Sequence, residues 1–158
     1  MIKKSFIIIL ISFFFNSCGF TPTHKVSDAA YKNSSVIYRV DVNNSYESRQ
    51  ILAKNLINAE KVDAKYYVDI KVIETETAIN IQSSGSVSKY RVETLINFEI
   101  HEINSDQLIY KSRSRGSSNY DVSSSEYTNK LLKENALTTS LSEAIQLMNV
   151  IINSKVNE

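Results

Sequence analysis

The sequence contains few of the residues that cross-link or break a chain: it has one cysteine, one proline and three glycines. A single cysteine excludes a disulfide within the chain. The scarcity of glycine and proline, beside many Ser and Asn residues, indicates long regular elements joined by polar turns.

The chain also lacks an apolar run long enough for a membrane-spanning helix. Its longest run is Phe6–Phe15, well short of the ~20 apolar residues that a spanning helix needs. A run of this length, preceded by Lys3 and Lys4, fits the hydrophobic region of a secretory signal, about 7–15 residues long. Residues 1–17 are therefore expected to be a signal peptide.

Cys18, the only cysteine, stands where that signal should be cleaved, between Ser17 and Gly19. This pattern resembles a bacterial lipobox, in which the thiol is diacylated and becomes the new N-terminus, although Phe15 and Asn16 replace the usual Leu and small residue. The alternatives are an ordinary cleaved signal or an uncleaved anchor. A lipid-anchored chain is favoured because an odd cysteine in an exported protein otherwise leaves a reactive thiol. The motif predicts a lipidated N-terminus and tether over residues 18–34. Gly19, rather than Asp, favours the outer membrane.

Neither charge nor histidine is abundant. Loss of Lys3 and Lys4 with the signal leaves 16 basic and 17 acidic residues, which gives no indication of nucleic-acid binding. His24 lies in the tether, and His101 is expected on the solvent side of a strand without a partner for acid–base work. The sequence has no phosphate-binding glycine loop, no metal-ligand cluster and no nucleophile motif. We therefore expect that the protein is not an enzyme and that it binds no cofactor or metal.

Hydrophobic periodicity predicts six elements in a single domain over residues 35–158. Asn44 with Glu47 and Ser123 with Glu126 have the spacing of helix-capping boxes. The expected strands are 35–42, 66–82, 89–103 and 108–117, and the expected helices are 44–58 and 123–153.

Turns at Ser83–Val87 and Asn104–Asp106 would join the last three strands into an antiparallel meander. They predict the cross-strand pairs Ile100–Tyr110, Phe98–Ser112, Ile70–Ile100 and Val72–Phe98, all on one apolar face. The fold class is therefore α+β. We expect a two-layer sandwich with the order strand-helix-strand-strand-strand-helix, in which two helices cover one face of a mixed four-stranded sheet.

Three basic residues, Lys111, Arg113 and Arg115, share one parity on the fourth strand and should project from the uncovered face. Lys89 and Arg91 have the same parity on the neighbouring strand and should border this patch, near Asn119 and Asp121. One interpretation is an edge strand protected by charge. The other is a face that binds an anionic ligand, because arginine forks match phosphate and carboxylate geometry.

Several segments, in this order and spacing, resemble the lipopolysaccharide-assembly lipoprotein LptE family, particularly its alphaproteobacterial branch. They cover nearly all of the chain, but each one is degenerate. The segments are Cys18–Pro22, Arg49–Leu56, Tyr66–Tyr110, Ser118–Tyr120 and Ser125–Tyr127, ahead of a last helix with Ala136 and Ala144.

The resemblance implies an outer-membrane lipoprotein on the periplasmic face, with two helices on a four-stranded sheet. Such a protein plugs and helps to assemble an LptD-type β-barrel and assists delivery of lipopolysaccharide (LPS) to the cell surface. The resemblance also implies LPS binding through basic residues, here Lys111, Arg113 and Arg115, with Lys89 and Arg91 secondary. The alternative is a tethered scaffolding lipoprotein without a lipid ligand.

Overall fold

The structure is a computed structural model that describes residues 35–56, 58 and 63–157. The expected signal peptide, the tether and Cys18 lie outside the described residues. The described residues belong to one compact unit, Tyr31–Glu158. Its elements are β1 (Val36–Val40), α2 (Tyr46–Asn55), β2 (Tyr66–Ile81), β3 (Val87–Glu102), β4 (Leu108–Asp121) and α3 (Glu126–Val156).

The strands form one mixed sheet in the order β1-β2-β3-β4. β1 runs parallel to β2 with α2 in the connection, while β2–β3 and β3–β4 are antiparallel. Two helices and a mixed four-stranded sheet confirm the α+β fold and the order of elements. The main differences in length are at β4, which continues to Asp121, and at α3, which continues to Val156.

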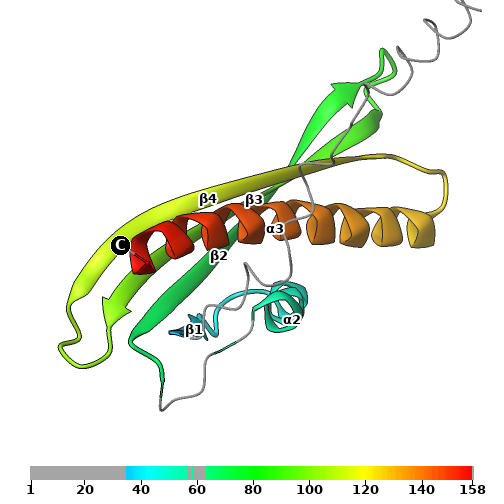
Figure 1. Cartoon of the computed structure of the whole chain (residues 1–158). Helices are drawn as coiled ribbons and strands as arrows, with labels where there is room; N and C mark the ends of the chain where they lie inside the picture. Colours follow the sequence, from blue (N-terminus) through cyan, green and yellow to red (C-terminus); the bar gives the residue numbers. More distant parts are fainter. Residues whose placement is uncertain (1–34, 57, 59–62, 158) are drawn as a thin grey trace, which may run out of the picture. The chain divides into compact units, whose positions relative to one another are not determined.

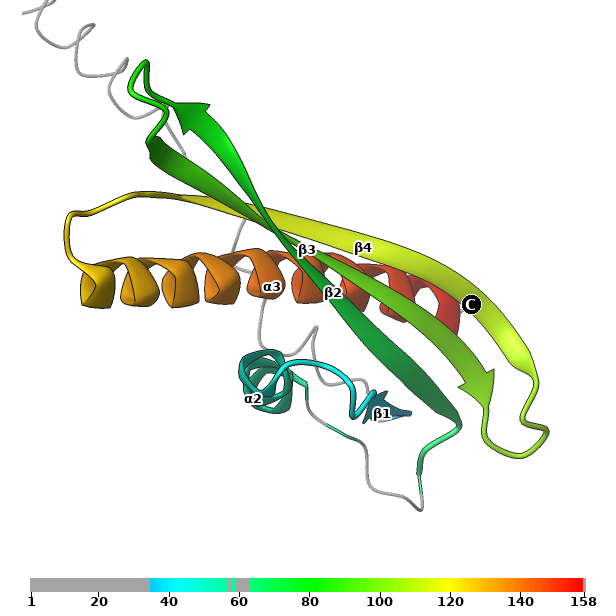
Figure 2. The same ribbon diagram turned by 180° about the vertical axis from the view of Figure 1, so that it is seen from behind.

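The core lies between the sheet and the two helices. Alternate residues of β2 and β3, such as Ile70, Ile96 and Phe98, are buried with Leu52 of α2 and Leu141 of α3 in one apolar cluster. Figures 1 and 2 show α3 running along one side of the sheet, with α2 on the same side as α3. None of the described elements covers the opposite side, which we call the open face.

The predicted register of the meander is half right. Ile100 lies opposite Tyr110 and Phe98 opposite Ser112, as expected. On the other side of β3, however, Phe98 lies opposite Ile70 rather than Val72, and Ile100 opposite Val68 rather than Ile70. The turn between β2 and β3 is centred one residue earlier than expected, and the pairing shifts by two.

Backbone geometry at this turn explains the shift. The Gln82 amide donates to the Ser86 carbonyl (2.9 Å) and the Gly85 amide to the Gln82 carbonyl (2.9 Å). Gly85 has a φ of +84°, a conformation that glycine adopts without the steric cost of a Cβ. The Ser-Ser-Gly segment therefore closes between Gln82 and Ser86. A displacement of two residues keeps every side chain on its expected face.

Both predicted capping boxes are wrong. Ser45 caps α2, accepting from the Ser48 amide at 3.1 Å, and Asn44 is instead buried with its Oδ1 accepting from the Val72 amide of β2. Ser125 caps α3, accepting from the Thr128 amide at 3.4 Å. Each helix begins later than predicted because the preceding polar residue bonds elsewhere.

Candidate anion-binding face

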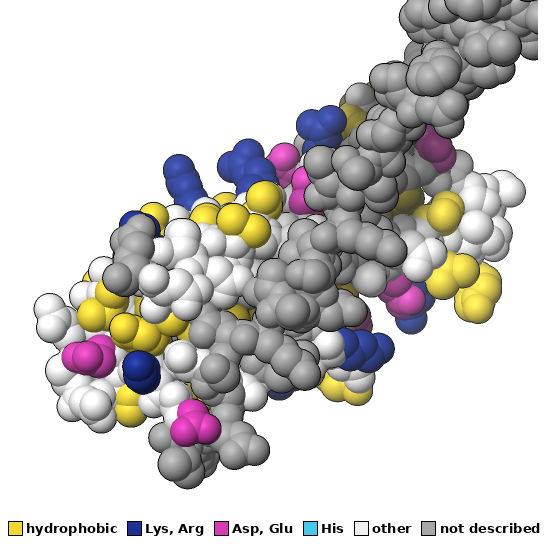
Figure 3. Space-filling model, in the orientation of Figure 1, with side chains coloured by type: hydrophobic (Ala, Val, Ile, Leu, Met, Phe, Trp, Pro, Cys, Tyr) yellow, Lys and Arg dark blue, Asp and Glu magenta, His cyan; other side chains and the backbone are white. Residues whose placement is uncertain are grey.

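The open face of the sheet carries the basic residues that the sequence singles out. On β4, Lys111, Arg113 and Arg115 are exposed, while Ser114 between the two arginines and Gly116 after Arg115 are buried toward α3. This alternation follows from the two-residue repeat of a strand, because α3 packs against only one side of β4. Figure 3 shows Lys and Arg side chains projecting along the margin of the molecule that β4 forms in Figure 1.

Three of the five predicted basic residues already have partners. Lys111 Nζ lies 2.6 Å from Glu99 Oε1, and Lys89 Nζ lies 3.2 Å from Asp121 Oδ1. Arg91 Nε donates to Asn119 Oδ1 at 3.2 Å. The expectation that Lys89 and Arg91 lie beside Asp121 and Asn119 is confirmed. Lys111, Lys89 and Arg91 are therefore less available to an anionic ligand than cations without a partner would be.

Arg113 and Arg115 differ from those three. Within the described part of the chain, no carboxylate lies within 4.0 Å of either guanidinium. Arg113 lies opposite Asn97 and Arg115 opposite Leu95, so their cross-strand neighbours carry no charge. Their five-donor forks are therefore available to a carboxylate or phosphate ligand.

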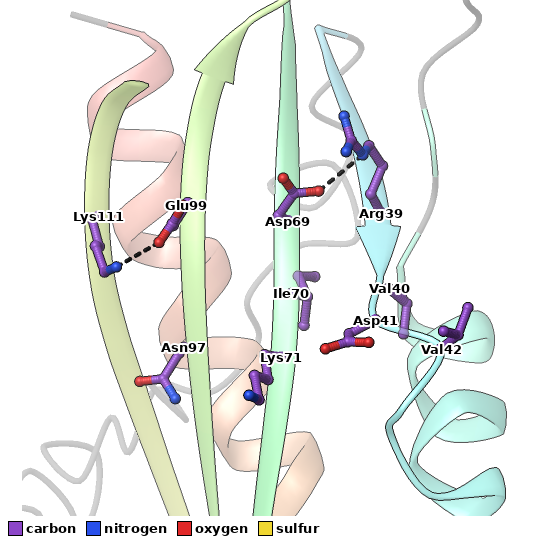
Figure 4. A pocket seen from close by; sticks show the side chains of 10 residues that line it. All are labelled: Arg39, Val40, Asp41, Val42, Asp69, Ile70, Lys71, Asn97, Glu99 and Lys111. Atoms are coloured by element: carbon purple, nitrogen blue, oxygen red, sulfur yellow. Dashed lines mark ion pairs between the residues drawn. The ribbon is translucent and has the colours of Figure 1, made fainter. Parts of the chain in front are cut away.

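Lys71 of β2 is a further exposed cation that sequence reasoning missed. It lies opposite Asn97, so Lys71, Asn97 and Arg113 form one rung across three strands. Figure 4 shows Lys71 and Asn97 next to one another, away from the two ion pairs drawn. The predicted register would have placed Lys71 opposite Glu99 as an ion pair, and the displacement by two places it opposite the neutral Asn97 amide.

The next rung of the open face is neutralised by ion pairs. Arg39 Nε contacts Asp69 Oδ1 at 2.9 Å, and Lys111 contacts Glu99. The hydrogen bond from Lys111 holds the pKa of Glu99 below its usual value. With both acids paired, the adjacent Lys71 and Arg113 are the charges left for a ligand.

His101 lies on the open face, as its parity predicts, but it is not solvent-facing. Its ring stacks on the ring of Tyr67, with the two centroids 4.8 Å apart. The Arg39 guanidinium lies over the Tyr67 ring as well, 4.2 Å from its centroid. Only 15% of the His101 side chain is exposed, and its Nε2 lies 3.5 Å from Glu99 Oε2. His101, Tyr67 and Arg39 therefore pack together at this end of the sheet.

A hollow of about 700 Å³ opens beside the end of β1, over the open face. Figure 4 shows the ion pairs Arg39–Asp69 and Lys111–Glu99 on one side of it and Lys71 and Asn97 on another. Because β1 stops at Val40, β2 has no neighbouring strand on this side beyond that point, where Asp41 and Asn44 bond to its edge instead. Lys71 and Asn97 of the rung line the hollow together with Asp41, whereas Arg113 lies outside its lining.

Two further observations concern the described residues as a whole. No three His, Cys, Asp or Glu side chains in this part of the chain are arranged to hold a metal ion. Among the described helices, none combines the length and apolar character needed to cross a membrane.

Comparisons with known proteins relate the fold to lipoproteins. A candidate lipoprotein from Caulobacter crescentus superposes with a TM-score of 0.61 at 15% identity, over 78% of this chain and 91% of that one. The minor lipoprotein from Acinetobacter baumannii gives 0.58 at 12% identity, over 77% and 91%. Lipoprotein B from Nitrosomonas europaea, itself uncharacterised, gives 0.57 at 9% identity, over 78% and 84%.

The fold is shared with these lipoproteins. By sequence, the chain matches no protein-family model and no curated protein. At such low identities the likeness concerns the backbone arrangement, so the role of the open face has to be argued from its own side chains.

Proposed function

We propose that the protein is a lipoprotein of the cell envelope, anchored through diacylated Cys18 at the periplasmic face of the outer membrane. There it plugs and helps to assemble a β-barrel that delivers LPS to the cell surface, and it binds LPS through its open face. Two features support the anchor: the lipobox-like motif around Cys18 and a fold shared with lipoproteins from three other species.

The observation that carries the ligand proposal is the group of unpaired cations on the open face. Arg113 and Arg115 lie two residues apart on one strand, and Lys71 lies on the same rung as Arg113. Phosphate groups on a glycolipid would accept charge-assisted hydrogen bonds from these side chains. Asn97 between the two cations adds an uncharged amide donor.

The ligand is tested by charge removal with a matched control. Arg113→Ala with Arg115→Ala should weaken binding to purified LPS, whereas Lys89→Ala should leave it nearly unchanged because Lys89 is already paired with Asp121. Both changes remove exposed side chains, and circular dichroism checks that each variant is folded. Equal binding by the double variant and the parent would reject the assignment of the ligand to this face.

The partner is tested separately. Extraction of the tagged protein in mild detergent should co-purify a much larger outer-membrane barrel, identified by mass spectrometry. Recovery of other envelope proteins without a barrel, together with no LPS binding, would instead support a scaffolding lipoprotein.

A further inference from the structure

The end of the sheet where the described chain begins also carries the turn that joins β3 to β4. The Ser35 carbonyl accepts from the amides of Lys65 (2.9 Å) and Tyr66 (3.0 Å), and the Ile103 amide donates to the Lys65 carbonyl (2.9 Å). The start of β1 therefore lies at the same end of the sheet as the turn that joins β3 to β4, with Lys65 bonded to both.

Three aliphatic side chains are exposed at this end, Ile103 in the turn and Leu108 and Ile109 at the start of β4. Ile103 is 37% exposed, Leu108 48% and Ile109 45%. None of them is needed to close the turn, which is held by backbone bonds between Glu102 and both Asp106 (2.9 Å) and Gln107 (3.0 Å).

The acidic groups of the turn are hydrogen-bonded within the fold. Glu102 Oε2 accepts from Ser105 Oγ at 2.5 Å, and Asp106 accepts from the Tyr67 hydroxyl. Carboxylates that already have hydrogen-bond donors cost less to bring close to an apolar phase than bare ones. The turn therefore combines exposed aliphatic side chains with acids that are partly satisfied.

Chain length ties this end to the expected anchor. Cys18 lies 17 positions before Ser35, and a random coil of that length has a root-mean-square span of about 23 Å. β3 has 16 residues, so the sheet is about 54 Å long. An anchor at Cys18 therefore attaches to the folded part at the end of the sheet that carries the β3–β4 turn, opposite to the β2–β3 turn.

We propose that the β3–β4 turn contacts the lipid surface, with Ile103, Leu108 and Ile109 inserting among the headgroups. This inference rests on the acylation of Cys18 in the proposed function. Three aliphatic side chains bind a bilayer weakly by themselves. The anchor makes their contact intramolecular and raises their effective concentration at the surface.

The test uses the acylated full chain in vesicles of phosphatidylethanolamine and phosphatidylglycerol, without any barrel. Because acylation occupies the only native thiol, Leu108→Cys and Ile109→Cys each supply a single site for an environment-sensitive fluorophore. Ile81→Cys is the matched control, since Ile81 is apolar and 62% exposed but lies at the opposite end of β2. Circular dichroism checks the fold of each variant, and the two turn positions provide independent readings.

Labels at 108 and 109 should emit at shorter wavelength on vesicles than in detergent-free buffer and be quenched by brominated lipids, with the label at 81 several-fold less affected. Equal exposure of all three labels to aqueous iodide on chains that float with the vesicles would overturn this inference alone. A free thiol at Cys18 in the mass spectrum would overturn the anchor, and the lipid contact with it.

Discussion

Gly116 of β4 lies so close to Ser140 of α3 that a Cβ added to the glycine would stand 2.0 Å from the Ser140 carbonyl oxygen. The obstacle is backbone, and the Ala144 amide nitrogen would be 2.9 Å away on the same helix. Next to this crossing, the hydroxyls of Thr94 and Ser140 are hydrogen-bonded at 2.8 Å within the core. Small and polar residues thus bring α3 against the sheet and leave Arg113 and Arg115 to the other side.

Gly116→Ala should therefore destabilise the fold markedly. Relieving the overlap requires α3 to move off β4, and overpacking of this kind costs about 1–3 kcal/mol or more. Urea unfolding followed by circular dichroism measures the change. Gly85→Ala is the control: its φ is +84° but no atom lies within 4 Å of the added Cβ, so only the backbone cost of about 1 kcal/mol applies. Equal losses at both positions would show that the helix does not pack as closely as described.

The sequence was sufficient to predict which side chains of each strand share a face of the sheet. It was not sufficient to predict which residues of neighbouring strands lie opposite one another. Alternation decides which side chains share a face, and both Arg113 and Lys71 lie on the expected side. A displacement by two residues leaves that alternation unchanged, so hydrophobicity could not distinguish Phe98 opposite Ile70 from Phe98 opposite Val72. The difference depends on how the Gln82–Ser86 turn closes, and it places Lys71 opposite Asn97 rather than Glu99.

The helix caps were mispredicted for a related reason. Asn44 and Ser123 have suitable side chains at suitable spacing, but both are engaged in other contacts. Asn44 makes a tertiary contact with the exposed edge of β2 just past the end of β1. Ser123 has local partners instead: its amide donates to Asn129 Oδ1 at 2.6 Å, and its Oγ accepts from the Ser125 amide at 3.2 Å.

The cap of α3 gives a second prediction. Ser125→Ala should cost about 1 kcal/mol of stability, because Ser125 Oγ accepts from the Thr128 amide at the first turn. Glu126→Ala should cost less, since the Ser123 amide that a capping-box glutamate would bind is satisfied by Asn129. Thermal unfolding of the two variants compares them directly. A larger loss for Glu126→Ala than for Ser125→Ala would restore the Ser123–Glu126 box.

A third prediction concerns acid stability. Burial by itself would raise the pKa of Glu76, but its hydrogen bonds with Lys133 and Tyr120 outweigh burial and lower the pKa. Because the folded-state pKa lies below the unfolded one, the stabilisation is complete above the unfolded pKa and is lost as the pH falls through the folded pKa. The free energy of unfolding should therefore decrease from about pH 5 downward.

Glu76→Gln should reduce the decrease in the free energy of unfolding at low pH. Urea unfolding at a series of pH values measures this dependence. Glu93→Gln is the control, because within the described residues Glu93 has no ion pair within 4.0 Å. An unchanged slope for Glu76→Gln would mean that the contact between Glu76 and Lys133, 2.6 Å long here, does not persist in solution.

The last prediction separates the Lys71–Arg113 rung from its neutralised neighbour. Lys71→Ala should weaken LPS binding, because Lys71 has no carboxylate partner among the described residues and lies on the same rung as Arg113. An exposed ion pair is worth up to about 1 kcal/mol, or roughly fivefold in Kd, and the effect should shrink as salt increases. Lys111→Ala should change Kd less, since its ammonium is already 2.6 Å from Glu99. Thermophoresis with purified LPS at two salt concentrations measures the Kd of both variants. A larger loss of affinity for Lys111→Ala than for Lys71→Ala would indicate that LPS binds at the rung of Glu99 instead.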